Sequence, residues 1–203
     1  MPSEKNALAS ALRSAGLTFD DCGFFKLNAW FPVLLIGANV SLVSWCRSSV
    51  ATLAVAMMPV PEAKVPFFVI TFMPIIAIVC TIVAIQSIAA IKPKGAAGRI
   101  RGGSVAKLGL PAWIDRLQQA QYNTWECCIC TVCTFFVAVS LGLPDVLFAK
   151  MATFLLLIRV LYVFAYVLDL DFVRTLLWLT GINTCLLTAF AALFPESVVP
   201  MLA

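Results

Sequence analysis

The sequence contains no histidine, and only 12% of its 203 residues are charged. The absence of histidine excludes a histidine-ligated zinc or haem site and any catalytic triad with an imidazole base. The low charge excludes an ordinary water-soluble domain, in which about a quarter of the residues are charged. The net charge of +4 is small and dispersed, so it does not indicate a nucleic-acid-binding protein.

Apolar side chains make up 62% of the chain, and the mean hydropathy is +1.00. A chain of this length cannot bury so much apolar surface in one core, which predicts a membrane protein. A membrane span needs about 20 consecutive, mostly apolar residues. Four stretches meet this requirement and are predicted to be membrane-spanning helices: residues 66–91, 117–143, 145–168 and 172–194. The short links at 141–144 and 169–171 predict that consecutive spans are antiparallel neighbours.

A less regular apolar stretch precedes these spans and is broken by Arg47 and the Ser48-Ser49 pair. It predicts one additional N-terminal membrane helix at about 29–46, followed by an interfacial or re-entrant piece that ends at Pro59 and Pro61. A long tilted helix or a membrane-surface helix is the alternative. The predicted organisation is an N-terminal extension (1–65), a four-helix membrane domain (66–194) and a short tail (195–203).

The long connection between the first two of these spans, residues 92–115, is rich in glycine and in basic residues. The positive-inside rule places such a loop on the cytosolic, matrix or stromal side. We therefore expect a multi-pass protein of an endomembrane or of an organelle membrane, mitochondrial or plastid. With this orientation, the inner leaflet contains the ends of the first and third spans and the starts of the second and fourth.

Polar residues that are rare within membranes gather in that inner layer. An ionisable residue at the centre of a span costs about 2.5–3.5 kcal/mol, which makes it a candidate functional residue. The candidates follow helical spacing on three spans: Arg116, Ala120, Asn123 and Glu126 on the second, Arg159, Tyr162 and Tyr166 on the third, and Arg174 on the fourth. Because the strips on the second and third spans reach similar depths, about 10–15 Å, they are predicted to converge around a polar pocket.

The side chains of this pocket suit a small zwitterionic, peptide-like ligand. Arginine presents a fork of donors to carboxylates, whereas asparagine and glutamate accept hydrogen bonds from amide and ammonium groups. Arg174 at the entrance is suited to stabilise a thiolate. The alternative is purely structural: Arg159 and Glu126 neutralise each other between packed helices, and the tyrosines are interfacial anchors.

Two motifs resemble those of a known membrane family. Residues 116–126, Arg-Leu-Gln-Gln-Ala-Gln-Tyr-Asn-Thr-Trp-Glu, resemble the R-x-x-x-A-[HQ]-x-N-x-x-E signature of the membrane-associated proteins in eicosanoid and glutathione metabolism, the MAPEG family. Residues 159–166, followed by Arg174-Thr175, resemble its R-x-x-[YH]-x-x-x-Y motif and next arginine. The resemblance covers roughly residues 66–194. It implies a left-handed four-helix bundle that forms a homotrimer, with glutathione between subunits near the inner face.

The resemblance also implies roles for individual residues. Arg174 would stabilise the thiolate, and six residues would contact glutathione: Arg116, Asn123, Glu126, Arg159, Tyr162 and Tyr166. The chain departs from the family at Gln119, where glutathione-using members often carry arginine, and at Cys127, where some members carry tyrosine. A basic residue of the family's first helix corresponds to Lys92 or Lys94, and the spacing does not decide between them.

These observations predict a glutathione-dependent transferase or peroxidase that acts on a lipophilic electrophile arriving through the membrane lipid. The alternative is a non-catalytic structural subunit of a larger organellar membrane complex, which the N-terminal extension and Gln119 favour. A transporter fits less well, because the charges cluster in one leaflet and the sequence has no inverted repeat.

The chain has eight cysteines, four of them at 127, 128, 130 and 133. These four lie along one predicted helix, where no turn brings four sulfur atoms around one ion, so no metal site is predicted. Free cysteine is a small, mostly buried residue, and we interpret the cysteines as core residues. Cys127 and Cys128, next to Glu126, are the ones whose reactivity we would test.

Overall fold

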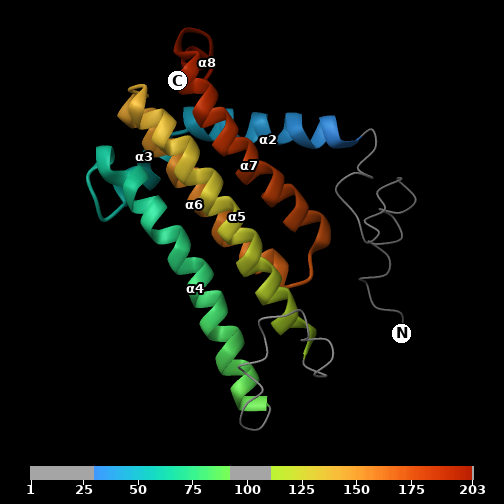
Figure 1. The fold of residues 1–203 in the computed structure, drawn as a ribbon. Coiled ribbons are helices and arrows are strands. Elements are labelled where there is room, and N and C mark those ends of the chain that lie inside the picture. Colours follow the sequence, from blue (N-terminus) through green and yellow to red (C-terminus); the bar gives the residue numbers. More distant parts are fainter. Residues whose placement is uncertain (1–29, 92–110, 203) are drawn as a thin grey trace.

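The computed structural model describes residues 30–91 and 111–202, with side chains from Val33 onward, and this part of the chain is helical without a strand. Its elements, in chain order, are α2 (Trp30–Arg47), α3 (Ser49–Ala56), the short 3-10 helix η1 (Glu62–Lys64), α4 (Val65–Ile91), α5 (Ala112–Ser140), α6 (Asp145–Val167), α7 (Asp171–Leu193) and α8 (Pro195–Leu202) (Figure 1).

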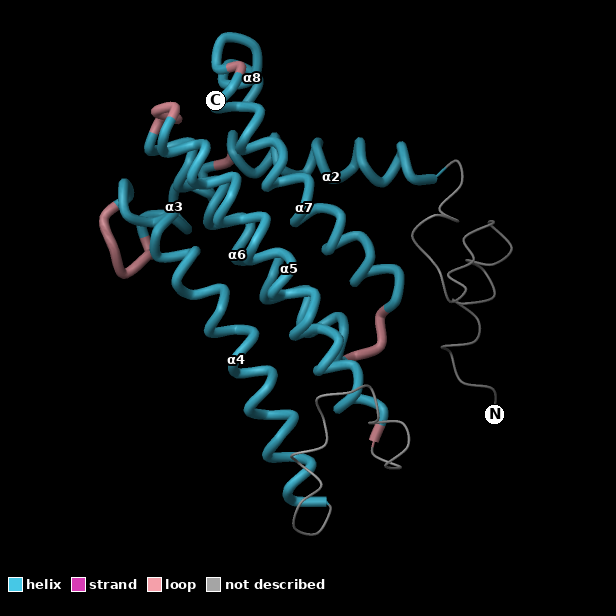
Figure 2. Tube along the Cα trace, in the orientation of Figure 1, coloured by secondary structure: helices cyan, strands magenta, loops and turns pink. Residues whose placement is uncertain are grey.

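Four of the described helices, α4 to α7, are long and apolar enough to cross a membrane. They run alternately in opposite directions, and short loops join α5 to α6 and α6 to α7 (Figure 2). Helix α6 is the most buried span and packs against both α5 and α7. Large hydrophobic side chains such as Phe136, 72% exposed, cover the outer surface, as expected for a bundle surrounded by lipid. The prediction of an all-helical membrane bundle with an extra N-terminal helix is confirmed.

Helix α5 begins at Ala112, five residues before the predicted start of its span. Pro111 precedes its first turn, and Asp115 lies in that turn, where a negative charge favours the positive end of the helix dipole. Arg116 therefore lies inside a helix rather than at its first residue. Lys92 and Lys94, together with most of the predicted basic loop, lie outside the described residues.

Two turns with left-handed residues reverse the chain between spans. Gly142 has φ +72° after α5, and Asp169 has φ +64° after α6. In the second turn, the N–H of Leu170 donates to the carbonyl of Ala165 at 2.9 Å, which satisfies one of the unpaired carbonyls of the helix end. The tight α6–α7 turn therefore keeps the end of α6 next to the beginning of α7.

The N-terminal segment forms a bent pair of helices. Helix α2 covers the predicted range, and α3 follows after a bend of 67° at Ser48, whose hydroxyl accepts a hydrogen bond from the N–H of Ala51. Helix α2 crosses the spans rather than running alongside them (Figure 1). By length and composition, α2 and α3 could cross a membrane only together, as this bent pair. The membrane crossing at 29–46 therefore stays a prediction.

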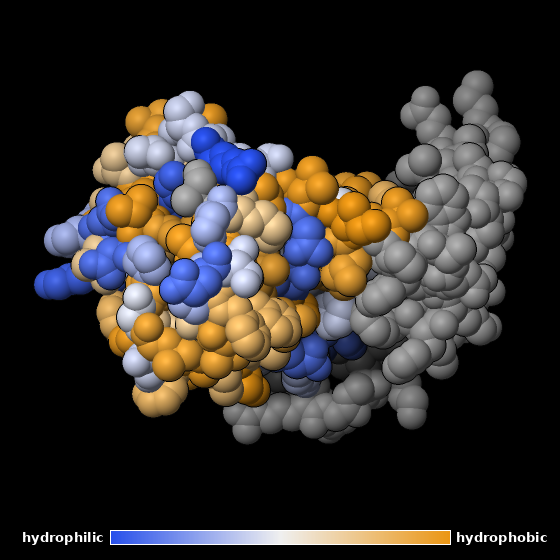
Figure 3. Space-filling view, turned by 90° about the horizontal axis from the view of Figure 1, so that it is seen from above, coloured by the Kyte–Doolittle hydropathy of each residue, from blue (hydrophilic) through white to orange (hydrophobic). Residues whose placement is uncertain are grey.

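Three hydrogen bonds hold the bent pair on α6 and α7. The indole N–H of Trp45 donates to the carbonyl of Lys150 at 2.9 Å, and Nζ of Lys150 donates to the carbonyl of Cys46 at 2.8 Å. The side-chain amide of Asn183 in α7 donates to that of Asn39 in α2 at 3.0 Å. Seen from the end that carries α2, α3 and α8, hydrophilic side chains gather over the bundle (Figure 3).

Candidate functional site

Asn123 is the centre of a polar cluster between α5 and α6. Its side-chain amide donates hydrogen bonds to the hydroxyls of Tyr162 at 2.7 Å and Tyr166 at 3.3 Å. Arg159 donates to the backbone carbonyl of the same asparagine. Arg159 and Tyr162 are 1% and 2% exposed, so these contacts lie inside the bundle. The structure thus brings the α5 and α6 strips together.

Two arginines lie over the two tyrosine rings. The guanidinium carbon of Arg159 is 4.5 Å from the ring centre of Tyr162, and that of Arg174 is 4.7 Å from the ring centre of Tyr166. At these distances the negative face of an aromatic ring attracts a cation. The tyrosine rings meet edge to face, with their centres 5.3 Å apart. Because Arg174 lies at the start of α7, the cluster includes residues of three helices.

Two carboxylates that were not among the predicted site residues pair with its arginines. Asp169 lies 3.2 Å from Arg116, and Asp171 lies 2.9 Å from Arg174. Asp169 lies in the α6–α7 turn and Asp171 is the first residue of α7, so both acids lie at the end of the bundle where α5 begins. The Asp-Leu-Asp sequence at 169–171 could have indicated these two partners, because it joins the span that carries Arg159 to the span that carries Arg174.

The cluster also leaves hydrogen-bond donors unsatisfied. In the described part of the chain, the Nε atoms of Arg116 and Arg159 are buried and have no hydrogen-bond partner. Buried donors in proteins are paired in the large majority of cases, so such atoms call for an acceptor. A carboxylate is the group that a guanidinium binds best. These two donors are therefore suited to a carboxylate acceptor.

Glu126 stands apart from the cluster. Its side chain is exposed, whereas Ala120 is buried and Asn123 is half-buried on the same helix. At about 100° per residue, ten residues place Glu126 about 80° around the helix from Arg116, which turns it away from α6. Among the described residues, the ion pairs are those of Arg116 and Arg174, so Arg159 is not neutralised by Glu126. The structural alternative, in which these two residues pair, does not describe this bundle.

The cysteines of α5 point in different directions. Cys127 and Cys128 are buried, Cys130 is half-buried and Cys133 is exposed. The hydroxyl of Thr131 lies 4.0 Å from the Cys127 sulfur and 3.6 Å from the sulfur of Cys185 in α7. Within residues 30–91 and 111–202, no three histidine, cysteine, aspartate or glutamate residues are arranged to hold a metal ion.

One of the comparisons with known proteins gives a match. The model of the MAPEG family matches residues 66–194, which is more than half of the chain and includes α5, α6 and α7 with the whole cluster. No curated protein and no solved structure matches the chain. The four-span bundle and the family match lead to one conclusion: the chain belongs to the MAPEG family.

Proposed function

We propose that this protein is a membrane-embedded, glutathione-dependent transferase or peroxidase that acts on a lipophilic electrophile. The observation that carries the proposal is the convergence of Arg159, Tyr162, Asn123 and Arg174 from three helices, with unsatisfied guanidinium donors beside them. Members of the MAPEG family generally use glutathione, which supports the same function. The α6–α7 end of the bundle then faces the cytosol, matrix or stroma of an endomembrane or organelle.

In this proposal Arg116 and Arg159 bind the carboxylates of glutathione through their unsatisfied Nε atoms. Asn123 and the two tyrosine hydroxyls contact its peptide groups. Glu126 binds the ammonium group, although it is exposed on a single chain. This arrangement requires a second copy of the chain to cover that face of α5, in agreement with a homotrimer whose site lies between subunits.

Arg174 is the proposed catalytic residue. Its guanidinium lies over Tyr166 and pairs with Asp171, and its side chain is 31% exposed, so it is accessible from the aqueous end of the bundle. A cation at this position stabilises the thiolate of glutathione after the thiol proton has passed to water. The thiolate then attacks an electrophilic carbon of the lipophilic substrate, a C–S bond forms, and the leaving group departs with its electron pair.

A second candidate is a non-catalytic subunit of a larger membrane complex. Helices α2 and α3 pack on α6 and α7 and lie outside the region matched by the family, so they add a surface that a partner can use. The exposed Gln119 also departs from the arginine of many glutathione-using members. Sizing in detergent separates the two functions, because the enzyme is expected as a trimer and the subunit with a large complex.

Calorimetric titration of the purified protein with glutathione tests the binding step. We expect saturable binding of glutathione. Glu126→Ala should weaken it about tenfold or more, because the variant loses one hydrogen bond between charged groups. Glu196→Ala, which removes an exposed carboxylate of α8, is the matched control and should bind normally. Absence of binding by the wild-type protein would exclude the enzymatic proposal.

Conjugation of glutathione to a chromogenic aryl halide tests the catalytic step. Arg174→Ala should lower kcat by about 10²-fold or more, which is the cost of removing one electrostatic contact to a developing charge. Arg174→Lys retains the charge and should recover part of the rate. Unchanged rates in Arg174→Ala would remove Arg174 from the mechanism.

A further inference from the structure

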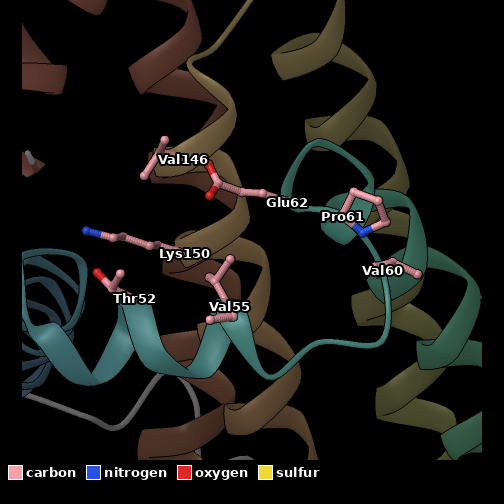
Figure 4. Close-up of a pocket in the computed structure, with 8 residues that line it drawn as sticks. Thr52, Val55, Val60, Pro61, Glu62, Val146 and Lys150 are labelled. Atoms are coloured by element: carbon pink, nitrogen blue, oxygen red, sulfur yellow. The ribbon is translucent and has the colours of Figure 1, made fainter.

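A cavity with both polar and apolar walls lies at the opposite end of the bundle from the arginine cluster. Its volume is about 290 Å³, and it lies between α3, the segment at 60–62 and the start of α6 (Figure 4). The walls are Val55, Val60 and Val146, and the polar members are Thr52, Glu62 and Lys150. Lys150 and Tyr162 are separated by about 18 Å along α6, so this cavity is distinct from the candidate active site.

The cavity contains two opposite charges that do not neutralise each other. Nζ of Lys150 donates one hydrogen bond to the Cys46 carbonyl, and an ammonium group carries three donors. Glu62 reaches the cavity from the other wall, and its carboxylate points toward Val146 (Figure 4). In the part of the chain that the structure describes, neither side chain takes part in an ion pair. A ligand with both a negative and a positive group can therefore pair with Lys150 and Glu62 at the same time.

An apolar groove adjoins this cavity. It has a volume of about 500 Å³, shares Val60 with the cavity, and continues along the first turns of α4 over Phe67, Phe68 and Thr71. Lys64, just before α4 begins, also lines the groove. Because α4 belongs to a candidate membrane span that begins at Glu62, we place the groove beside the acyl chains and the charged cavity at the membrane surface. The two spaces together have the shape and polarity of an amphiphile.

We propose that this site binds one zwitterionic phospholipid with a primary ammonium in its headgroup. Lys150 and the hydroxyl of Thr52 bind the phosphate, Glu62 binds the ammonium group, and an acyl chain lies in the groove along α4. A cavity of this size is at the lower limit for small-molecule pockets, which fits a headgroup rather than a whole lipid. The site uses no residue of the arginine cluster, so it holds whether or not the proposed enzymatic function does.

Native mass spectrometry of the full chain, released from mixed vesicles of phosphatidylethanolamine and phosphatidylglycerol, tests this site. We expect one retained phosphatidylethanolamine per chain, in preference to phosphatidylglycerol. Glu62→Gln should lower that preference about tenfold, the loss of one hydrogen bond between charged groups, because the ammonium loses its carboxylate. Glu196→Gln, on α8 at the same end of the bundle, is the matched control and should retain the preference.

Two results with the wild-type protein would overturn the proposal. One is equal retention of both lipids by the wild-type protein, since Glu62 should disfavour an anionic headgroup without an ammonium. The other is complete displacement by soluble glycerophosphoethanolamine at the concentration of the lipid, because the groove along α4 would then contribute nothing. Retention by Glu62→Gln of the wild-type preference would likewise exclude Glu62 as the ammonium ligand.

Discussion

Asp169 has two tasks at the end of α6. It is the only described residue other than glycine with a positive φ, +64°, and it directs the chain into α7. Its carboxylate lies 3.2 Å from Arg116 at the start of α5. Aspartate tolerates the left-handed conformation better than most residues, because its short side chain can form local hydrogen bonds. One residue thus determines both the tight turn and the partner of an arginine in the cluster.

Substitutions at Asp169 separate these tasks. Asp169→Ala should lower the free energy of unfolding in detergent by about 1–2 kcal/mol, because the left-handed conformation is strained for alanine. Asp169→Gly removes the strain and loses only a partly exposed ion pair, worth about 0–1 kcal/mol. Unfolding followed by circular dichroism measures both values. Equal losses in the two variants would contradict a conformational role for this residue.

Among the elements, α2 is attached to the bundle by a small number of polar contacts. Asn39 and Asn183 form the hydrogen bond between α2 and α7, and both side chains lie between apolar helices. Hydrogen bonds between helices in membranes contribute about 0.6–2 kcal/mol each. The sulfur of Cys46, at the end of α2, is buried by this packing. Its reactivity with a thiol reagent therefore reports how often α2 separates from the bundle.

Asn39→Leu should increase the alkylation rate of Cys46 by about 3- to 30-fold, because Asn183 loses its partner and α2 separates more often. Peptide mass spectrometry after timed alkylation resolves Cys46 from the other cysteines. Ser41→Ala is the control, since among the described residues the Ser41 hydroxyl donates its hydrogen bond to the Gly37 carbonyl of its own helix. An unchanged rate in Asn39→Leu would show that apolar packing alone holds α2.

For the whole molecule, the outer face of α5 is the feature that a single chain does not explain. It carries the exposed Glu126 among large exposed apolar side chains such as Ile129 and Phe136. A carboxylate on a face that meets only lipid is costly, whereas a protein surface can pair it. The homotrimer in the proposed function places this face between subunits.

Cys133 lies on the exposed surface of α5, so crosslinking through its thiol tests this contact. Mild oxidation in native membranes should give a disulfide-linked dimer of chains, because the proposed trimer brings the α5 faces of neighbouring subunits together. Cys133→Ser should abolish the product, and Cys130→Ser should leave it unchanged. The product would be identified by electrophoresis without reducing agent. A linked dimer that persists in Cys133→Ser would contradict this subunit contact.

The sequence by itself determined the four spans, their alternating direction and the level at which Arg159, Tyr162 and Asn123 meet. Span length, apolar runs and short turns are local properties, and helical spacing fixes the depth of a side chain along its own helix. Only the tertiary structure decided the other features: the pairing of Arg116 with Asp169, the outward position of Glu126 and the crossing of α2 over the bundle. These depend on how each helix is rotated and packed against its neighbours, and such rotations are set by contacts between residues far apart in the chain.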